Sequence, residues 1–126
     1  MRMAWFKRKP RITHDIYGKL MMSFGRAVDK DSFIAQPAAA LAERVAGEFS
    51  GITADLDAKA YAGSTVYHLR LLAGSWLMAA EGSVPRATAE VFEEAVAWKF
   101  GPKVKASGEL ARRVSELARG EGERKV

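Results

Sequence analysis

The sequence predicts an all-α protein, a single-domain five-helix bundle around a buried central helix. Apolar residues recur at intervals of three and four along most of the chain, the pattern of amphipathic helices. One stretch, residues 57–80, would be apolar on nearly every side if helical, as a core helix is. The chain has 126 residues and no cysteine, which suits one domain and excludes disulfides and thiolate metal sites.

The first predicted helix covers residues 13–28. Thr13 is expected to cap it, and Asp15 lies in the first turn, where the helix dipole favours an acid. Gly18 and Gly25 lie two turns apart on one side, which permits a close helix crossing. Its apolar stripe comprises Ile12, Ile16, Leu20, Phe24 and Ala27.

The second predicted helix covers residues 37–50, after a polar break at residues 29–32. Pro37 suits a first helical turn, because its missing N–H has no partner there in any case. Gly51 is expected to cap the C-terminus of this helix. The face formed by its alanines predicts a close approach to a neighbouring helix.

The central stretch is predicted to be a core helix rather than a membrane span. Its run without ionisable residues, 71–80, has ten residues, whereas a span needs about 20. His68 and Arg70 bound that run on its N-terminal side. Either Thr53 or Asp57 is expected to begin this helix, because residues 53–59 are themselves compatible with a helix. Gly82 is expected to end it, since glycine is common just beyond a helix end.

Two further helices are predicted, over residues 85–100 and 107–119. Pro85 marks the start of the first, and Gly101 with Pro102 stops it. The last helix has a thin apolar stripe and is expected to be the least firmly packed; the stripe consists of Leu110, Val114 and Leu117.

The predicted domain organisation therefore has three parts. Residues 1–11 form a basic aromatic N-terminal tail, residues 12–119 the helical domain, and residues 120–126 a charged, flexible C-terminal tail.

The net charge of +5 is concentrated at the N-terminus. Five of the twenty basic residues precede the first acidic one, and the other fifteen balance fifteen acidic residues. The five are Arg2, Lys7, Arg8, Lys9 and Arg11. A high positive charge suggests an anionic partner, and here that suggestion attaches to the tail alone.

Residues 5–9 combine aromatic with basic side chains. Trp5 and Phe6 precede Lys7, Arg8 and Lys9, a pairing that suits an anionic lipid surface. The same pairing suits a phosphate backbone with stacked bases. A third interpretation is that the two aromatic rings fold back onto the domain.

A polar lane along the central helix is the candidate small-molecule site. Ser64 and His68 are four residues apart, so their side chains can meet on a helix, and Tyr61 lies one turn before. Arg70 could bind an anion. The lane also includes Thr65 and Ser75, and the alternative is a buried network of satisfied hydrogen bonds.

Other chemistry has little support in the sequence. The two histidines, His14 and His68, are far apart and no metal-ligand spacing is present, so no metal site is expected. We expect no cofactor, because there is no glycine-rich phosphate loop, and no nucleophile elbow is present. We interpret Glu90, Glu93 and Glu94 as solvent charge.

These observations favour a non-enzymatic interaction or adaptor protein whose N-terminus contacts an anionic membrane face. The alternative is a small-molecule-binding or enzymatic domain using Tyr61, Ser64, His68 and Arg70, and nucleic-acid binding through the tail is the third hypothesis. A protein partner is expected, with a homodimer favoured by apolar surface. We expect a cytoplasmic location, peripheral to the inner face of the membrane, because no secretory signal is apparent.

Overall fold

The computed structural model describes residues 12–58, 65–101 and 108–125, with side chains as far as Glu121. These residues are almost entirely helical and include no strand, which confirms the all-α prediction. The described part contains six helices rather than five: α2 (His14–Lys30), α3 (Ser32–Glu48), α4 (Ser50–Leu56), α5 (Thr65–Ala80), α6 (Arg86–Phe100) and α7 (Gly108–Lys125). The short helix α4 is the one that the sequence did not predict.

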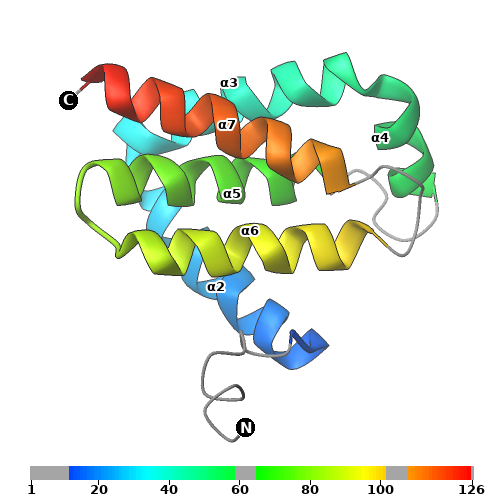
Figure 1. Ribbon diagram of the computed structural model, residues 1–126, viewed down its shortest axis with the longest axis horizontal. Coiled ribbons are helices and arrows are strands. Elements are labelled where there is room, and N and C mark those ends of the chain that lie inside the picture. Colours follow the sequence, from blue (N-terminus) through cyan, green and yellow to red (C-terminus); the bar gives the residue numbers. More distant parts are fainter. Residues whose placement is uncertain (1–11, 59–64, 102–107, 126) are drawn as a thin grey trace, which may run out of the picture.

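Figure 1 shows α5, α6 and α7 side by side, with α3 alongside α7 and α2 crossing the others steeply. Helix α5 contacts each of the other five described helices. Its buried residues run almost without interruption from His68 to Leu77, so little of the helix faces solvent. None of the helices in the described ranges is both long and apolar enough to cross a bilayer.

Helix α2 begins as its sequence predicts. The Thr13 side chain accepts a hydrogen bond from the Ile16 amide at 3.1 Å, so it satisfies one of the free donors of the first turn. The helix continues to Lys30, two residues beyond the predicted end, and this places a basic side chain in its last turn.

Helix α3 starts earlier than predicted. Asp31 caps it, accepting a hydrogen bond from the Phe33 amide at 3.0 Å, so the helix begins at Ser32. Pro37 therefore lies in the second turn rather than the first. Because proline has no N–H, the Phe33 carbonyl lacks its usual helical donor there.

The predicted cap at Gly51 is wrong. The chain leaves the α3 conformation at Phe49, where φ is −120° and ψ is 44°, and turns helical again at Ser50. The Thr53 hydroxyl donates to the carbonyl of Phe49 at 3.0 Å and lies 3.3 Å from that of Ala46. Gly51 consequently lies inside α4.

The predicted start of the central helix, at Thr53 or Asp57, is also wrong, because Thr53 lies inside α4 and Asp57 follows its end. Asp57 accepts hydrogen bonds from both the amide and the hydroxyl of Thr65, the first residue of α5. In one continuous helix these residues would be roughly 12 Å apart along the axis. They therefore cannot belong to a single straight helix, and the carboxylate of Asp57 caps the start of α5 instead.

The turn between α5 and α6 follows the sequence signals. Gly82 has a φ of 87°, in the left-handed region, and the Ser83 amide donates to the Met78 carbonyl at 2.9 Å. Pro85 then occupies the N-cap position of α6. The end of α5 and the beginning of α6 are confirmed.

Helix α7 is longer and better buried than predicted. It extends to Lys125, beyond the predicted end at residue 119. Leu110 and Val114 are fully buried, as are the two alanines beside them, Ala111 and Ala118. The small side chains widen the apolar face of α7 and allow it to pack on α5, α6 and α3, so the expectation of a weakly packed last helix is wrong.

Candidate functional site

The residues proposed from the sequence are only partly described. Tyr61 and Ser64 lie outside the described residues, as do Trp5, Phe6, Lys7, Arg8 and Lys9 of the tail. His68 and Arg70 are both described. His68 faces α2 and α6, whereas Arg70 makes its ion pair at the end of α2, so the two have different surroundings.

His68 is a buried member of an aromatic cluster. Its side chain is 8% exposed, and its Nδ1 is hydrogen-bonded to the hydroxyl of Tyr17. Its ring stacks on Tyr17 with centroids 5.6 Å apart and meets Phe100 edge-on at 5.8 Å. Burial, with a smaller contribution from the positive charge of Lys99, lowers the pKa of His68 to about 4. The imidazole is therefore neutral at pH 7.

The other described members of the polar lane are bonded within the protein. Thr65 donates to Asp57, and the Ser75 hydroxyl donates to the Leu72 carbonyl at 2.7 Å. Both side chains are fully buried. The described part of the lane thus has the features of a structural hydrogen-bond network rather than of an open binding site.

Arg70 links α5 to the end of α2. One terminal nitrogen donates to Asp29 at 2.7 Å, and the guanidinium carbon lies 4.8 Å from the centre of the Tyr67 ring. Close by, Gly74 faces Val28, and a β-carbon on that glycine would lie 2.5 Å from a methyl carbon of the valine. Helix α2 packs against this side of α5. The contacts of Arg70 are therefore made with Asp29 and Tyr67 rather than with a ligand.

Aromatic and basic side chains surround the point at which residues 1–11 join the bundle. Ile12 is partly buried against the core, and the ring of His14 meets Trp98 edge-on at 5.1 Å. The Lys99 ammonium lies 3.4 Å from Nδ1 of His14 and 5.5 Å from the centre of the Tyr17 ring. The first described residues after the tail therefore lie near aromatic and basic side chains, the same two kinds of residue that the tail contains.

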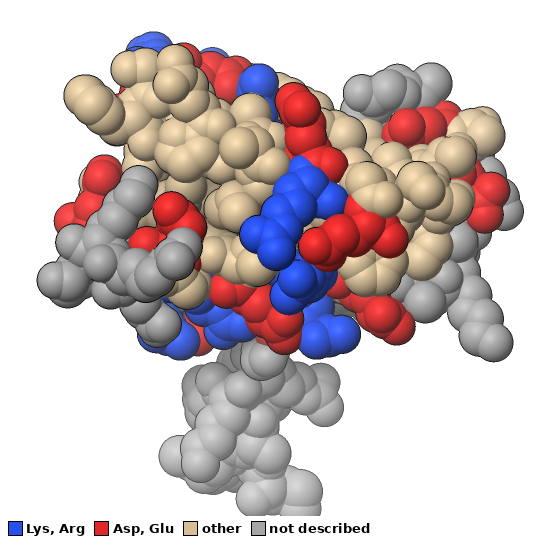
Figure 2. All heavy atoms as spheres, turned by 90° about the horizontal axis from the view of Figure 1, so that it is seen from above, with Lys and Arg blue, Asp and Glu red and all other residues tan. Residues whose placement is uncertain are grey.

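The face of the domain that carries α3 and α7 has charged side chains of both signs, several of them in ion pairs. Figure 2, which looks down on the face carrying α3 and α7, shows basic and acidic side chains interleaved. Arg113 donates to Glu48 at 3.1 Å, and this contact lowers the pKa of the glutamate. Arg112 pairs with Glu116 at 2.9 Å. This face forms no continuous basic surface.

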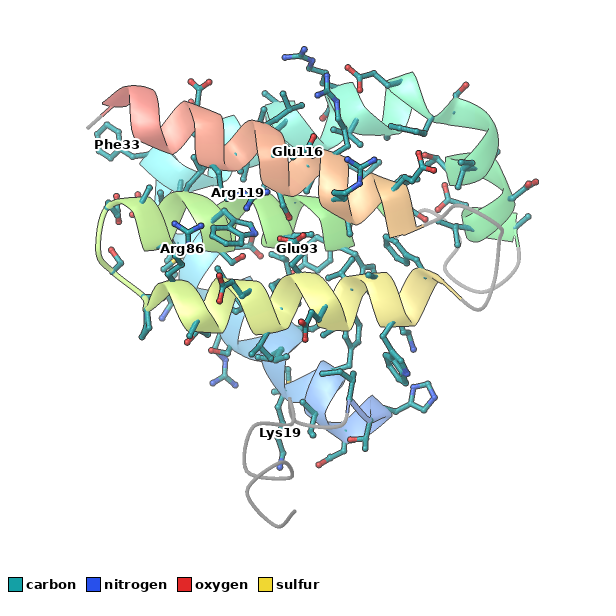
Figure 3. All side chains as sticks on the ribbon, viewed as in Figure 1. Lys19, Phe33, Arg86, Glu93, Glu116 and Arg119 are labelled. Atoms are coloured by element: carbon teal, nitrogen blue, oxygen red, sulfur yellow. The ribbon has the colours of Figure 1, made fainter. Side chains whose placement is uncertain are left out.

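A groove across α5, α6 and α7 was not foreseen from the sequence. Its base is Trp76, which is 3% exposed and donates from Nε1 to Glu93 at 3.1 Å. The guanidinium carbons of Arg86 and Arg119 lie 5.5 and 4.9 Å from the centre of the indole. Figure 3 shows Arg86, Glu93 and Arg119 converging on this place from α6 and α7.

The groove consists of two adjoining hollows that share Trp76 and Arg119. The larger, of about 420 Å³, is lined by Trp76, Ala87, Glu90, Val91, Glu93, Glu94 and Arg119. The smaller, of about 90 Å³, is lined by Trp76, Ala79, Ala80, Arg86 and Arg119. No local pattern predicts it, because its residues come from three helices and each has an ordinary role on its own helix.

No protein-family model, curated protein or solved structure matches this chain. Any functional assignment therefore depends on the residues themselves.

Proposed function

We propose that the protein is a non-enzymatic helical interaction module that residues 1–11 hold at an anionic membrane surface, at the inner face of the membrane. The observation that carries the proposal is the distribution of charge. The whole net charge of +5 belongs to residues 1–11, and the remaining fifteen basic and fifteen acidic residues cancel. A domain of zero net charge is neither attracted to nor repelled by an anionic surface as a whole, so the tail would decide the encounter.

The tail has both components of an interfacial anchor. Near an anionic surface, each lysine or arginine contributes about 1 kcal/mol of attraction. Trp5 and Phe6 precede three consecutive basic residues, and aromatic rings favour the depth of the lipid headgroups. At the root of the tail, His14, Trp98 and Lys99 extend the same chemistry onto the domain. A short anchor of this kind gives reversible binding.

The described surface favours a membrane over nucleic acid. A protein that binds a duplex presents a basic stripe or patch along one face. On the α3–α7 face, Arg112 and Arg113 are each paired with a glutamate instead. This face therefore offers no basic stripe to a duplex, and nucleic-acid binding through the tail is an outcome that the vesicle experiment distinguishes.

We further propose that a second copy of the chain is the protein partner, and that it docks on α2 and α5. An open hollow there is lined by the side chains of Met21, Met22 and Tyr67, and Met22 is 60% exposed. Its lining also includes charged residues of both signs, Arg26, Asp29 and Lys30. A two-fold dimer places the same patch on both subunits, so a lining of mixed sign can be complementary to itself.

The membrane proposal is tested by vesicle co-sedimentation with matched charge variants. Reversing Lys7, Arg8 and Lys9 to glutamate should reduce binding to anionic vesicles by tenfold or more. The control reverses three exposed basic residues of the domain, Lys19, Arg44 and Arg112, which changes the net charge equally and leaves the proposed dimer surface intact. Equal losses from both triple variants, or tighter binding of the intact protein to single-stranded nucleic acid than to the vesicles, would contradict the proposal.

A further inference from the structure

We propose that the groove over Trp76 is a binding site for a small zwitterion, a molecule in which a short alkyl chain joins a carboxylate or phosphate to an ammonium group. The site lies on α5, α6 and α7, and it does not depend on the tail or on membrane binding. Four observations support it: the two arginines at one end, the glutamates at the other, the apolar base between them and the continuity of the two hollows.

The smaller hollow suits the anionic group. Its charged lining residues are Arg86 and Arg119, and the rest of its lining is Trp76 with two alanines. A guanidinium presents N–H donors in a planar fork that matches the two oxygens of a carboxylate or phosphate. Because two positive groups lie near one ring, an anion between them would also relieve their mutual repulsion.

Both arginines are already positioned. The contact of each guanidinium with the Trp76 ring is a cation–π interaction, which restricts the position of the charge. Arg119 is further held by a 3.3 Å hydrogen bond from its Nε to the Ser115 carbonyl. Arg86 reaches Glu90 at 3.5 Å, but both of these side chains are largely exposed. Such a pair contributes little to stability, so exchanging it for a ligand costs little.

The larger hollow suits the ammonium group. Three carboxylates line it, those of Glu90, Glu93 and Glu94. The carboxylate of Glu93 is oriented by the indole N–H of Trp76 at 3.1 Å. Ala87 and Val91 complete this hollow and offer an apolar surface to methylene groups. An ammonium there would meet acceptors while its alkyl chain lies against carbon.

The balance of charge selects a ligand that carries both signs. Two arginines and three glutamates line the groove together, and positive and negative groups dominate opposite hollows. An ion of a single sign would gain from one hollow and be opposed by the other. A zwitterion gains from both, because Trp76 and Arg119 belong to both hollows and make them adjoin.

The test is an NMR titration that follows the indole N–H signal of Trp76 in the intact protein. The probes are phosphoethanolamine and 4-aminobutanoate, compared with ethanolamine, butanoate and inorganic phosphate. We expect a saturable shift with at least one zwitterion, at an affinity at least tenfold tighter than that for any of the single-charge fragments. A flat response to both zwitterions and to the lipid vesicles described below, or fragments that bind as tightly as the zwitterions, would overturn the proposal.

Variants connect the shift to the groove. Arg86→Gln and Arg119→Gln should each weaken zwitterion binding by about tenfold or more. Arg112→Gln is the matched control, an exposed arginine of α7 that does not line the groove. If the control weakens binding as much as Arg119→Gln does, the site is wrong. The dispersion of the amide spectrum identifies any variant that is unfolded, and Arg86, being exposed, provides the substitution least coupled to folding.

A vesicle comparison distinguishes the two sources of the phosphate–ammonium chemistry. Neutral vesicles of phosphatidylcholine with and without phosphatidylethanolamine present zwitterionic headgroups without attracting the basic tail. Only the ethanolamine headgroup carries N–H donors for the glutamates of the larger hollow, so the choline lipid is the control. A Trp76 shift with the soluble zwitterion indicates a free ligand, and a shift only with the ethanolamine lipid indicates a headgroup site.

Discussion

Replacement of Gly74 by alanine should destabilise the protein, although alanine is the better helix former. The added β-carbon would lie 2.5 and 3.0 Å from the two methyl carbons of Val28 and 3.3 Å from its Cβ. Favourable carbon contacts lie at about 3.5–4.0 Å. Val28 is fully buried in α2, and a β-branched side chain in a helix has essentially one rotamer. The valine cannot rotate away, so α2 and α5 must separate.

The magnitude follows from two opposing effects. Overpacking of a tight core contact costs about 1–3 kcal/mol, and the gain in helix propensity from glycine to alanine is about 1 kcal/mol. Because the 2.5 Å approach is closer than real β-carbons come to a neighbour, the overpacking cost lies in the upper part of its range, about 2–3 kcal/mol. We therefore expect a net loss of about 1–2 kcal/mol in the free energy of unfolding. Gly18→Ala in α2 is the matched control, because nothing lies within 4 Å of its added β-carbon. That variant should be about 1 kcal/mol more stable than the original protein.

Urea unfolding followed by far-UV circular dichroism measures both variants. The midpoints should move in opposite directions with little change in slope, since the surface exposed on unfolding is nearly the same. The cost of Gly74→Ala should shrink by at least about 1 kcal/mol in a Val28→Ala background, where the clash is absent. If Gly74→Ala equals or exceeds the original protein in stability, the close contact between α2 and α5 is refuted.

Two further substitutions test the buried polar groups. The pKa of His68 falls from 6.5 to about 4 on folding. As the pH is lowered, the unfolded chain therefore takes up the proton before the folded protein does. The free energy of unfolding, unaffected by His68 above pH 6.5, should fall by up to about 3 kcal/mol as the pH drops to 4. His68→Gln should remove most of this pH dependence in denaturant unfolding at a series of pH values, and an unchanged profile would contradict a neutral, buried imidazole. Asp57→Ala removes both acceptor contacts to Thr65 and should cost about 1–3 kcal/mol in thermal or urea unfolding. A loss no greater than that from Asp55→Ala, an exposed neighbour, would show that the cap contributes nothing.

Helix ends that depend on local chemistry could be predicted from the sequence. Thr13 caps α2, and Gly82 with Pro85 separates α5 from α6, because each acts on backbone groups within a few residues. The helical class was equally accessible, since the apolar stripes that indicate it are periodic along the chain.

Features that depend on distant residues could not be predicted. Gly47 and Gly51 flank the break at Phe49, and the helix end was predicted within two residues, but neither glycine forms it, because Phe49 itself takes the non-helical conformation. The cap that Asp57 provides for Thr65 joins residues eight positions apart, which no local pattern indicates. The burial of α7 depends on Ala111 and Ala118, whose small size predicts neither exposure nor burial. The groove needs Trp76, Arg86 and Arg119 from three helices, so only the packing of α5, α6 and α7 brings it together.

The proposed attachment of the protein to an anionic surface is tested most directly by comparing the intact protein with a version that begins at Ile12. Both are titrated with vesicles of increasing anionic lipid content, at low and at high salt. We expect that only the intact protein binds, that binding grows with anionic lipid and that salt weakens it. Equal binding of the two proteins would contradict the role of residues 1–11, because the shorter protein has a net charge of zero and lacks the aromatic residues Trp5 and Phe6.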